Sequence, residues 1–156
     1  MKSKFVALVI LQLFFIVSCK TKEQVEADRL SGGWIITEAA YSQRGSNQVD
    51  STITYSKSVF DFGSCKLTTS NRECFGYYSF NGVKRTAVSY GISVSENKLN
   101  ISPVDQNNRE GIDLTGSFQI EKVNEKLMYL YGPAGYTDEK GKFHLQALDI
   151  KLTLIR

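Results

Sequence analysis

The segment 112–122 alternates apolar and polar side chains, and this period of two constrains the fold more than any other feature. Ile112, Leu114, Phe118 and Ile120 alternate with Asp113, Thr115, Ser117, Gln119 and Glu121. Along 148–154, Leu148, Ile150, Leu152 and Leu154 alternate with Asp149, Lys151 and Thr153. Strict alternation predicts strands with one buried and one wet face, which is typical of antiparallel sheets.

Six further segments complete a set of eight predicted strands. They cover residues 34–41, 58–65, 75–80, 86–94, 98–103 and 126–131, and 112–122 and 148–154 are the other two. Short polar connections at 81–82, 95–97 and 123–125 are typical of hairpins, and no segment has the 3.6-residue period of a crossover helix. The predicted fold is therefore all-β, an eight-stranded antiparallel up-and-down barrel. A two-sheet sandwich is the alternative.

The predicted outer face of this barrel is polar. Its side chains include Asp113, Gln119, Glu121, Asp149 and Lys151. A membrane-embedded barrel needs an apolar outer band flanked by aromatic girdles, so this pattern indicates a barrel outside the bilayer.

The first 18 residues have the layout of a secretory leader. A basic start with Lys2 and Lys4 precedes thirteen residues, 5–17, that are apolar except for Gln12. Thirteen helical residues are too short to cross about 30 Å of hydrocarbon. The sequence therefore predicts a signal peptide at 1–18, a charged tether at 19–31 and a barrel domain at 32–156. The eleven tether residues 20–30 span up to about 37 Å if extended. A short helix within the tether, over 23–30, is also compatible with its sequence.

The end of this leader, Ile16-Val17-Ser18-Cys19, resembles the lipobox of bacterial lipoproteins. The resemblance implies cleavage before Cys19 and acylation of that residue, which attaches the protein to the membrane. More than one acyl chain matters for this attachment, because a single chain anchors only reversibly. Lys20 in the second position implies an outer-membrane destination, facing the periplasm or the surface. An ordinary signal peptide or an uncleaved anchor is the alternative.

Charge and cysteine content narrow the function classes. Removing Lys2 and Lys4 with the leader leaves 17 basic against 16 acidic side chains, a formal charge of +1. No nucleic-acid partner is expected from this balance. Cys65 and Cys74 remain, and in an oxidising compartment an even pair predicts a disulfide, whereas two thiols are too few for zinc.

Residues at the two ends of the domain are similar to those of the lipocalins. Gly32-Gly33-Trp34 matches the Gly-x-Trp signature at the start of their first strand. The resemblance implies that Trp34 closes one end of the barrel and that a basic residue at the end of the last strand covers its ring. Arg156 has the parity of the inward residues of that strand and can fill this role, with a cation–π contact of roughly 0.5–2 kcal/mol. The chain thus looks like a lipocalin-like domain of a bacterial cell-envelope lipoprotein.

The winding of the strands places long connections at the end opposite Trp34, where a ligand-binding barrel has its mouth. Tyr41, Tyr55 and Tyr136 are expected on the rim. Parity predicts a lining of Glu38, Phe60, Val88, Tyr90, Leu114, Tyr129, His144 and Gln146. Because an eight-stranded barrel is only just wide enough to be filled by side chains or to hold one small ligand, a solid core is the competing interpretation. Glu38 could pair with His144 or a tyrosine hydroxyl, or orient a ligand.

Motifs for catalysis are absent from the sequence: there is no Gly-x-Ser-x-Gly elbow, phosphate loop or His-rich metal spacing. We therefore expect a monomeric binding protein without cofactor or metal, holding a small hydrophobic ligand in the barrel. The alternative is a non-enzymatic adaptor with a filled barrel, whose loops dock another envelope protein or a glycan.

Overall fold

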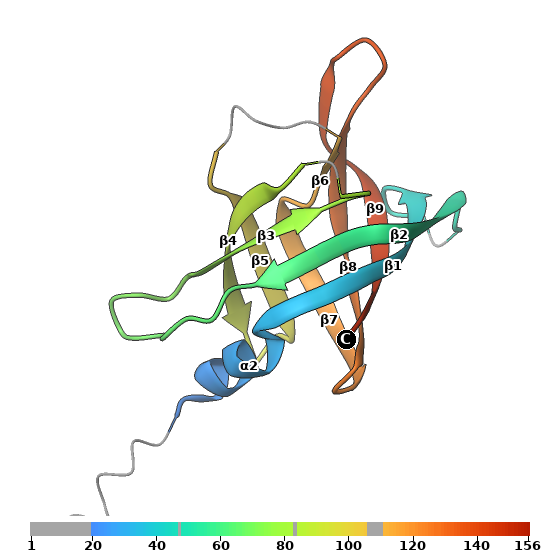
Figure 1. Cartoon of the computed structure of the whole chain (residues 1–156). Helices are drawn as coiled ribbons and strands as arrows, with labels where there is room; N and C mark the ends of the chain where they lie inside the picture. Colours follow the sequence, from blue (N-terminus) through green and yellow to red (C-terminus); the bar gives the residue numbers. More distant parts are fainter. Residues whose placement is uncertain (1–19, 47, 83, 106–110) are drawn as a thin grey trace, which may run out of the picture.

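The computed structural model describes residues 20–46, 48–82, 84–105 and 111–156 (Figure 1). The predicted leader and Cys19 lie outside these residues. In this part of the chain one helix precedes nine strands. They are α2 (Lys22–Leu30), β1 (Gly32–Gln43), β2 (Ser51–Phe62), β3 (Cys74–Ser79), β4 (Thr86–Ser93), β5 (Lys98–Pro103), β6 (Ile112–Asp113), β7 (Gly116–Asn124), β8 (Leu127–Thr137) and β9 (Phe143–Ile155).

Eight of these strands form a closed antiparallel barrel. The strand order is β7-β5-β4-β3-β2-β1-β9, and β8 pairs with both β7 and β9 to close the ring, while the two-residue β6 adds to the upper part of β8. Within the eight-stranded ring, each strand pairs antiparallel with the next one along the chain, and β9 pairs with β1. The predicted barrel is confirmed, and the two-sheet alternative is not observed.

Some strand limits differ from the prediction. β2 begins at Ser51 rather than at residue 58, and β8 continues to Thr137 rather than ending at 131. The connections before β2 and after β8 are therefore shorter than the predicted strands imply. The predicted strand 112–122 is divided into β6 and β7 by a bend at Gly116, whose φ is +144°. This bend turns Asp113 into a buried position, although alternation predicts it on the wet face, and its Oδ1 accepts a hydrogen bond from the Thr115 N–H at 2.9 Å.

The helix α2 packs under the end of the barrel where β1 begins (Figure 1). Thr21 caps it by accepting a hydrogen bond from the Gln24 N–H at 3.1 Å, and Ala27 and Leu30 are buried against the barrel. The short helix that the sequence allowed is thus present. An extended spacer is wrong for residues 22–30, because the apolar side chains of this helix are buried against the barrel. Within the described residues, no helix has the length and apolar character needed to cross a bilayer.

Candidate functional site

Trp34 closes the end of the barrel above α2. Its side chain is fully buried, and its Nε1–H donates a hydrogen bond to the Leu30 carbonyl at 2.8 Å. The guanidinium carbon of Arg156 lies 4.4 Å from the centre of the indole ring. The predicted stacking of these two residues is confirmed. Arg156 also donates hydrogen bonds to the carbonyls of Leu30, at 3.0 Å, and Ser31, so it joins the last strand to the end of the helix.

A column of aromatic rings fills the barrel behind β2, β3 and β4. Phe60 and Phe62 stack in parallel with centroids 4.2 Å apart, and Phe62 meets the ring of Tyr90 edge-on at 5.2 Å. Towards the other end, the ring centroids of Phe60 and Tyr78 are 5.9 Å apart. Tyr78 packs against Phe80, and Phe80 packs against Tyr55. The column therefore runs along the interior from the closed end to the predicted mouth.

Four of the predicted lining residues lie inside the barrel. Phe60, Val88, Tyr90 and Leu114 are at most 2 % exposed and belong to one continuous hydrophobic core. Their inward direction is confirmed. Because other side chains of this core cover them, these four residues are part of a packed interior and do not line an open cavity.

Two predicted lining residues point outward. A β-bulge between Ile36 and Glu38 inserts one residue into β1, which reverses the parity of the strand, and Glu38 is exposed. In the first half of β8 the buried residues are Met128 and Leu130, and Tyr129 between them lies on the outer wall with the Lys151 ammonium 4.3 Å from its ring centre. The inward placements of Glu38 and Tyr129 are therefore wrong.

His144 and Gln146 belong to the β8–β9 hairpin, which extends beyond the barrel in Figure 1. The His144 ring stacks on Tyr136, with centroids 4.9 Å apart, and its Nε2 is 2.9 Å from an Asp138 carboxylate oxygen. This contact, together with the backbone N–H of Lys142, holds the pKa of Asp138 below its usual value. Gln146 Nε2 donates to the Thr115 carbonyl at 3.3 Å. Glu38 and His144 are thus not brought together, and Tyr136 lies in the hairpin.

The other two predicted rim tyrosines lie below the rim. Tyr41 and Tyr55 are buried, and their hydroxyls share a hydrogen bond of 2.9 Å. Burial raises the pKa of Tyr41 and of Tyr55 above the usual range. At the other end, burial and the charge of Asp61 raise the pKa of Tyr90 to about 12, and its hydroxyl donates to the Gly63 carbonyl at 2.7 Å.

These buried phenols predict a loss of stability in alkaline solution. An unfolded tyrosine ionises near pH 10, whereas the folded chain keeps these three protonated. The unfolded state therefore binds fewer protons above about pH 10, and we expect the free energy of unfolding to fall as the pH rises from about 10 to 12. Urea denaturation at pH 9, 10 and 11 measures this slope. In Tyr90→Phe the fall should be shallower, and an unchanged slope in that variant would contradict a role for Tyr90.

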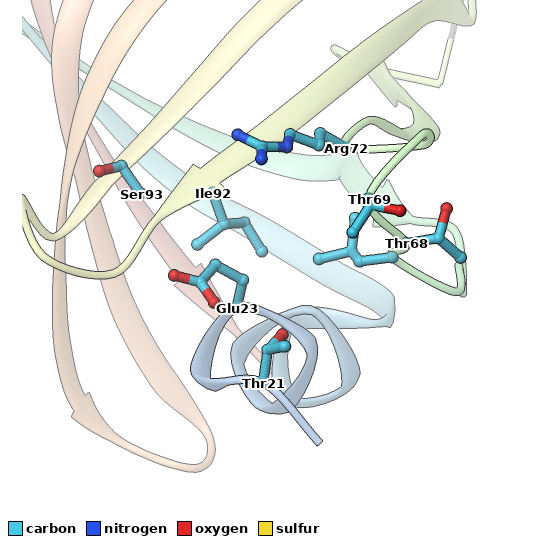
Figure 2. A pocket seen from close by; sticks show the side chains of 8 residues that line it. Thr21, Glu23, Thr68, Thr69, Arg72, Ile92 and Ser93 are labelled. Carbon is cyan, nitrogen blue, oxygen red and sulfur yellow. The ribbon is translucent and has the colours of Figure 1, made fainter. Parts of the chain in front are cut away.

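Two of the pockets that the described residues form open outside the barrel. One, of about 580 Å³, lies beside the Trp34 end and is lined mainly by charged side chains. Its lining is Asp28, Arg29, Lys122, Asn124, Glu125, Lys126 and Arg156. The other, of about 550 Å³, lies between α2, the connection 63–73 and β4 (Figure 2). Sequence reasoning missed both, because their walls come from segments with no shared motif and from a helix whose position the sequence does not specify.

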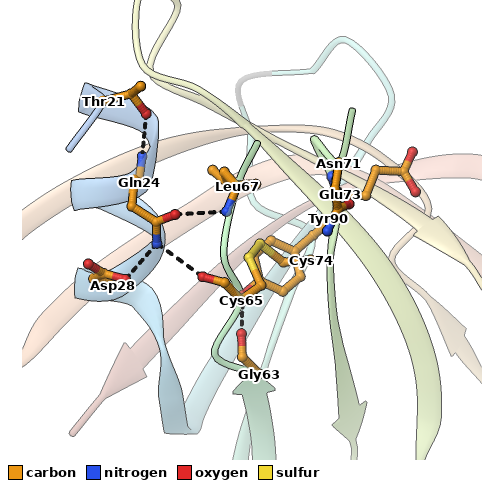
Figure 3. Close-up of a disulfide and its surroundings, with 10 residues drawn as sticks. All are labelled: Thr21, Gln24, Asp28, Gly63, Cys65, Leu67, Asn71, Glu73, Cys74 and Tyr90. Atoms are coloured by element: carbon orange, nitrogen blue, oxygen red, sulfur yellow. Dashed lines mark hydrogen bonds between the residues drawn. A yellow bond between two sulfur atoms is a disulfide. The ribbon is translucent and has the colours of Figure 1, made fainter. Parts of the chain in front are cut away.

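The predicted disulfide is confirmed and shapes the second pocket. Cys65 and Cys74 are bonded across the base of the 63–73 connection (Figure 3). The Gln24 side chain attaches this connection to α2, because its Nε2 donates to the Cys65 carbonyl at 3.0 Å and its Oε1 accepts from the Leu67 N–H at 2.7 Å. The helix, the connection and the barrel thus form one fixed wall.

Among the described residues, no cluster of three or more His, Cys, Asp or Glu side chains is arranged to hold a metal ion. No family model matches the chain, and no match is found among curated proteins or solved structures.

Proposed function

We propose that this chain is a lipid-anchored, non-enzymatic binding domain of a bacterial cell envelope, in which a filled lipocalin-like barrel serves as a rigid scaffold. The observation that carries the proposal is the aromatic column inside the barrel. Its rings and the surrounding core side chains occupy the space where a lipocalin-type ligand would lie. Contacts with other envelope molecules are therefore made on the outside.

The outer wall offers an apolar row that suits such a contact with a protein. Ile35 on β1 faces Val59 on β2 and Ile155 on β9, and Ile155 faces Leu127 on β8. Ile35 is 49 % exposed and Ile155 is 37 % exposed. Four aliphatic side chains in register across four strands resemble the apolar part of a protein interface more than a glycan site, which would present aromatic faces.

The position of α2 sets the distance between the anchor and the barrel. The helix begins at Lys22 and packs on the barrel, so only Lys20 and Thr21 separate it from Cys19. The three steps from Cys19 to Lys22 span at most about 11 Å. Acylation of Cys19 therefore holds the Trp34 end of the barrel against the membrane, with the β8–β9 hairpin pointing away from it.

Mass spectrometry of protein purified from its own membrane tests this proposal. We expect a chain that begins at Cys19 and carries acyl chains, without a bound hydrophobic molecule other than phospholipid. Cys19→Ala should keep the leader and lack the acyl mass. An unmodified Cys19 would contradict the anchor, and a hydrophobic molecule retained inside the barrel would restore the ligand-binding alternative.

A further inference from the structure

The pocket beside α2 has the size of a small-ligand site. Its volume of about 550 Å³ falls within the range of about 300–1,000 Å³ that is typical of such sites. Two aliphatic side chains and a set of polar ones share its surface. The lining residues are Thr21, Glu23, Leu67, Thr68, Thr69, Arg72, Ile92 and Ser93.

The walls of this pocket are held in place before any ligand binds. The disulfide and Gln24 fix the connection 63–73 at its base, as Figure 3 shows. Further out, the Thr68 N–H donates to the Asn71 carbonyl at 2.8 Å, and the Thr68 hydroxyl accepts from the Asn71 N–H at 3.0 Å. Such preorganisation lowers the entropic cost of binding.

Two opposite charges face this pocket without partners among the described residues. Arg72 comes from the 63–73 connection and Glu23 from the first turn of α2, and Figure 2 shows them on opposite sides of Ile92. Neither side chain forms a hydrogen bond or ion pair with the part of the chain that the structure describes. A ligand that carries both an anion and a cation would complement the two charges.

The pocket also lies close to the predicted anchor. Thr21 lines it, and Cys19 is two residues earlier in the chain, so an acylated Cys19 places the pocket within about 7 Å of the membrane interface. This step rests on the proposed function. At that level the abundant zwitterions are lipid headgroups.

We propose that this pocket binds a zwitterionic phospholipid headgroup in which a phosphate is joined to a primary ammonium, as in phosphatidylethanolamine. Arg72 binds the phosphate through paired N–H groups. Thr68 and Thr69, from the same connection, also line the pocket. Glu23 accepts hydrogen bonds from the ammonium. Leu67 and Ile92 contact the glycerol and the first methylene groups.

The lining also predicts selectivity among headgroups. A quaternary ammonium has no N–H to donate to Glu23 and is usually recognised by an aromatic cage, and the lining contains no aromatic ring. A headgroup with only negative charge is repelled by Glu23. Choline and glycerol headgroups should therefore bind more weakly than ethanolamine.

Titration of the chain in non-ionic detergent with dihexanoyl phosphatidylethanolamine tests this site, with backbone amide chemical shifts as the readout. We expect saturable shifts concentrated in residues 67–72 and around Glu23, and at least tenfold weaker binding of the phosphatidylcholine and phosphatidylglycerol analogues. Arg72→Ala should weaken binding about tenfold, and Glu23→Gln should remove the preference for ethanolamine over choline. Lys98→Ala is the matched control, because this partly exposed lysine lies outside the pocket and pairs with Glu96 at 3.0 Å.

Equal binding of the three lipids, or an unchanged affinity in Arg72→Ala, would overturn the proposal. Equally tight binding of glycerophosphoethanolamine, which has no acyl chains, would show that the ligand is a soluble molecule rather than a membrane lipid. Because the titration is done in detergent, it does not depend on acylation of Cys19. A failure of the anchor is read from the mass of the protein, and a failure of the headgroup site is read from the shifts.

Discussion

Replacing Phe60 with alanine is expected to lower the free energy of unfolding by about 3–5 kcal/mol. Phe60 is fully buried at the centre of the aromatic column, between the ring of Phe62 at 4.2 Å and that of Tyr78 at 5.9 Å. The truncation removes its contacts with both rings and leaves a cavity that a closed barrel of paired strands cannot collapse around. Urea denaturation of the unsubstituted protein and of Phe60→Ala measures this loss as a difference in the free energy of unfolding, with the same dependence on urea concentration for both.

Phe75→Ala provides the matched control. Phe75 is also a strand phenylalanine, on β3, but its side chain is 61 % exposed on the outer wall. Its truncation should cost less than about 1 kcal/mol. A loss for Phe60→Ala as small as that of the control would mean that the interior is not tightly packed, and a hollow ligand-binding barrel would again be the better interpretation.

Alternation was sufficient to predict the closed barrel, because a period of two with one apolar face leaves few ways to bury that face. The inward residues of β9 show why: Ile150, Leu152 and Leu154 are all fully buried, and Arg156 continues the same parity onto Trp34. The cysteine count was sufficient for the disulfide in the same way, since only one pairing remains after the leader is removed.

Parity alone could not place the residues near irregularities. Glu38 follows a bulge that leaves no mark in the sequence, so a strictly alternating count assigns it to the wrong face. In β8, residues 127–131 are apolar or aromatic at every position, and such a run carries no information about which side faces inward. The choice between Met128 and Tyr129 is made by packing against neighbouring strands.

The pocket beside α2 could not be predicted from the sequence, because long-range packing forms it. Gln24 and the Leu67 N–H meet across 43 residues of sequence, and nothing in either segment indicates the other. The same holds for the position of α2, whose packing makes residues 22–30 of the predicted tether part of the folded domain.

Trp34→Ala is expected to cost about 3–5 kcal/mol and to release α2 from the barrel. Trp34 is fully buried and contributes the hydrogen bond of 2.8 Å to the Leu30 carbonyl, and its ring is the surface on which Arg156 lies. Loss of the indole removes its own hydrogen bond to the end of the helix and the ring on which Arg156, the second residue bonded to that end, is stacked. Hydrogen exchange of the backbone amides in 25–31 should therefore become faster than exchange in the barrel strands.

Two further variants separate the indole from its neighbours. Arg156→Ala should cost only about 0.5–1 kcal/mol, because this cation is exposed, while exchange in α2 should still increase. Ile35→Ala, next to Trp34 in the chain but 49 % exposed on the outer wall, should change neither quantity by much. If α2 keeps its protection in Trp34→Ala, the helix is held mainly by Gln24 and its own apolar face. The Trp34–Arg156 pair would then close the barrel without fixing the position of α2.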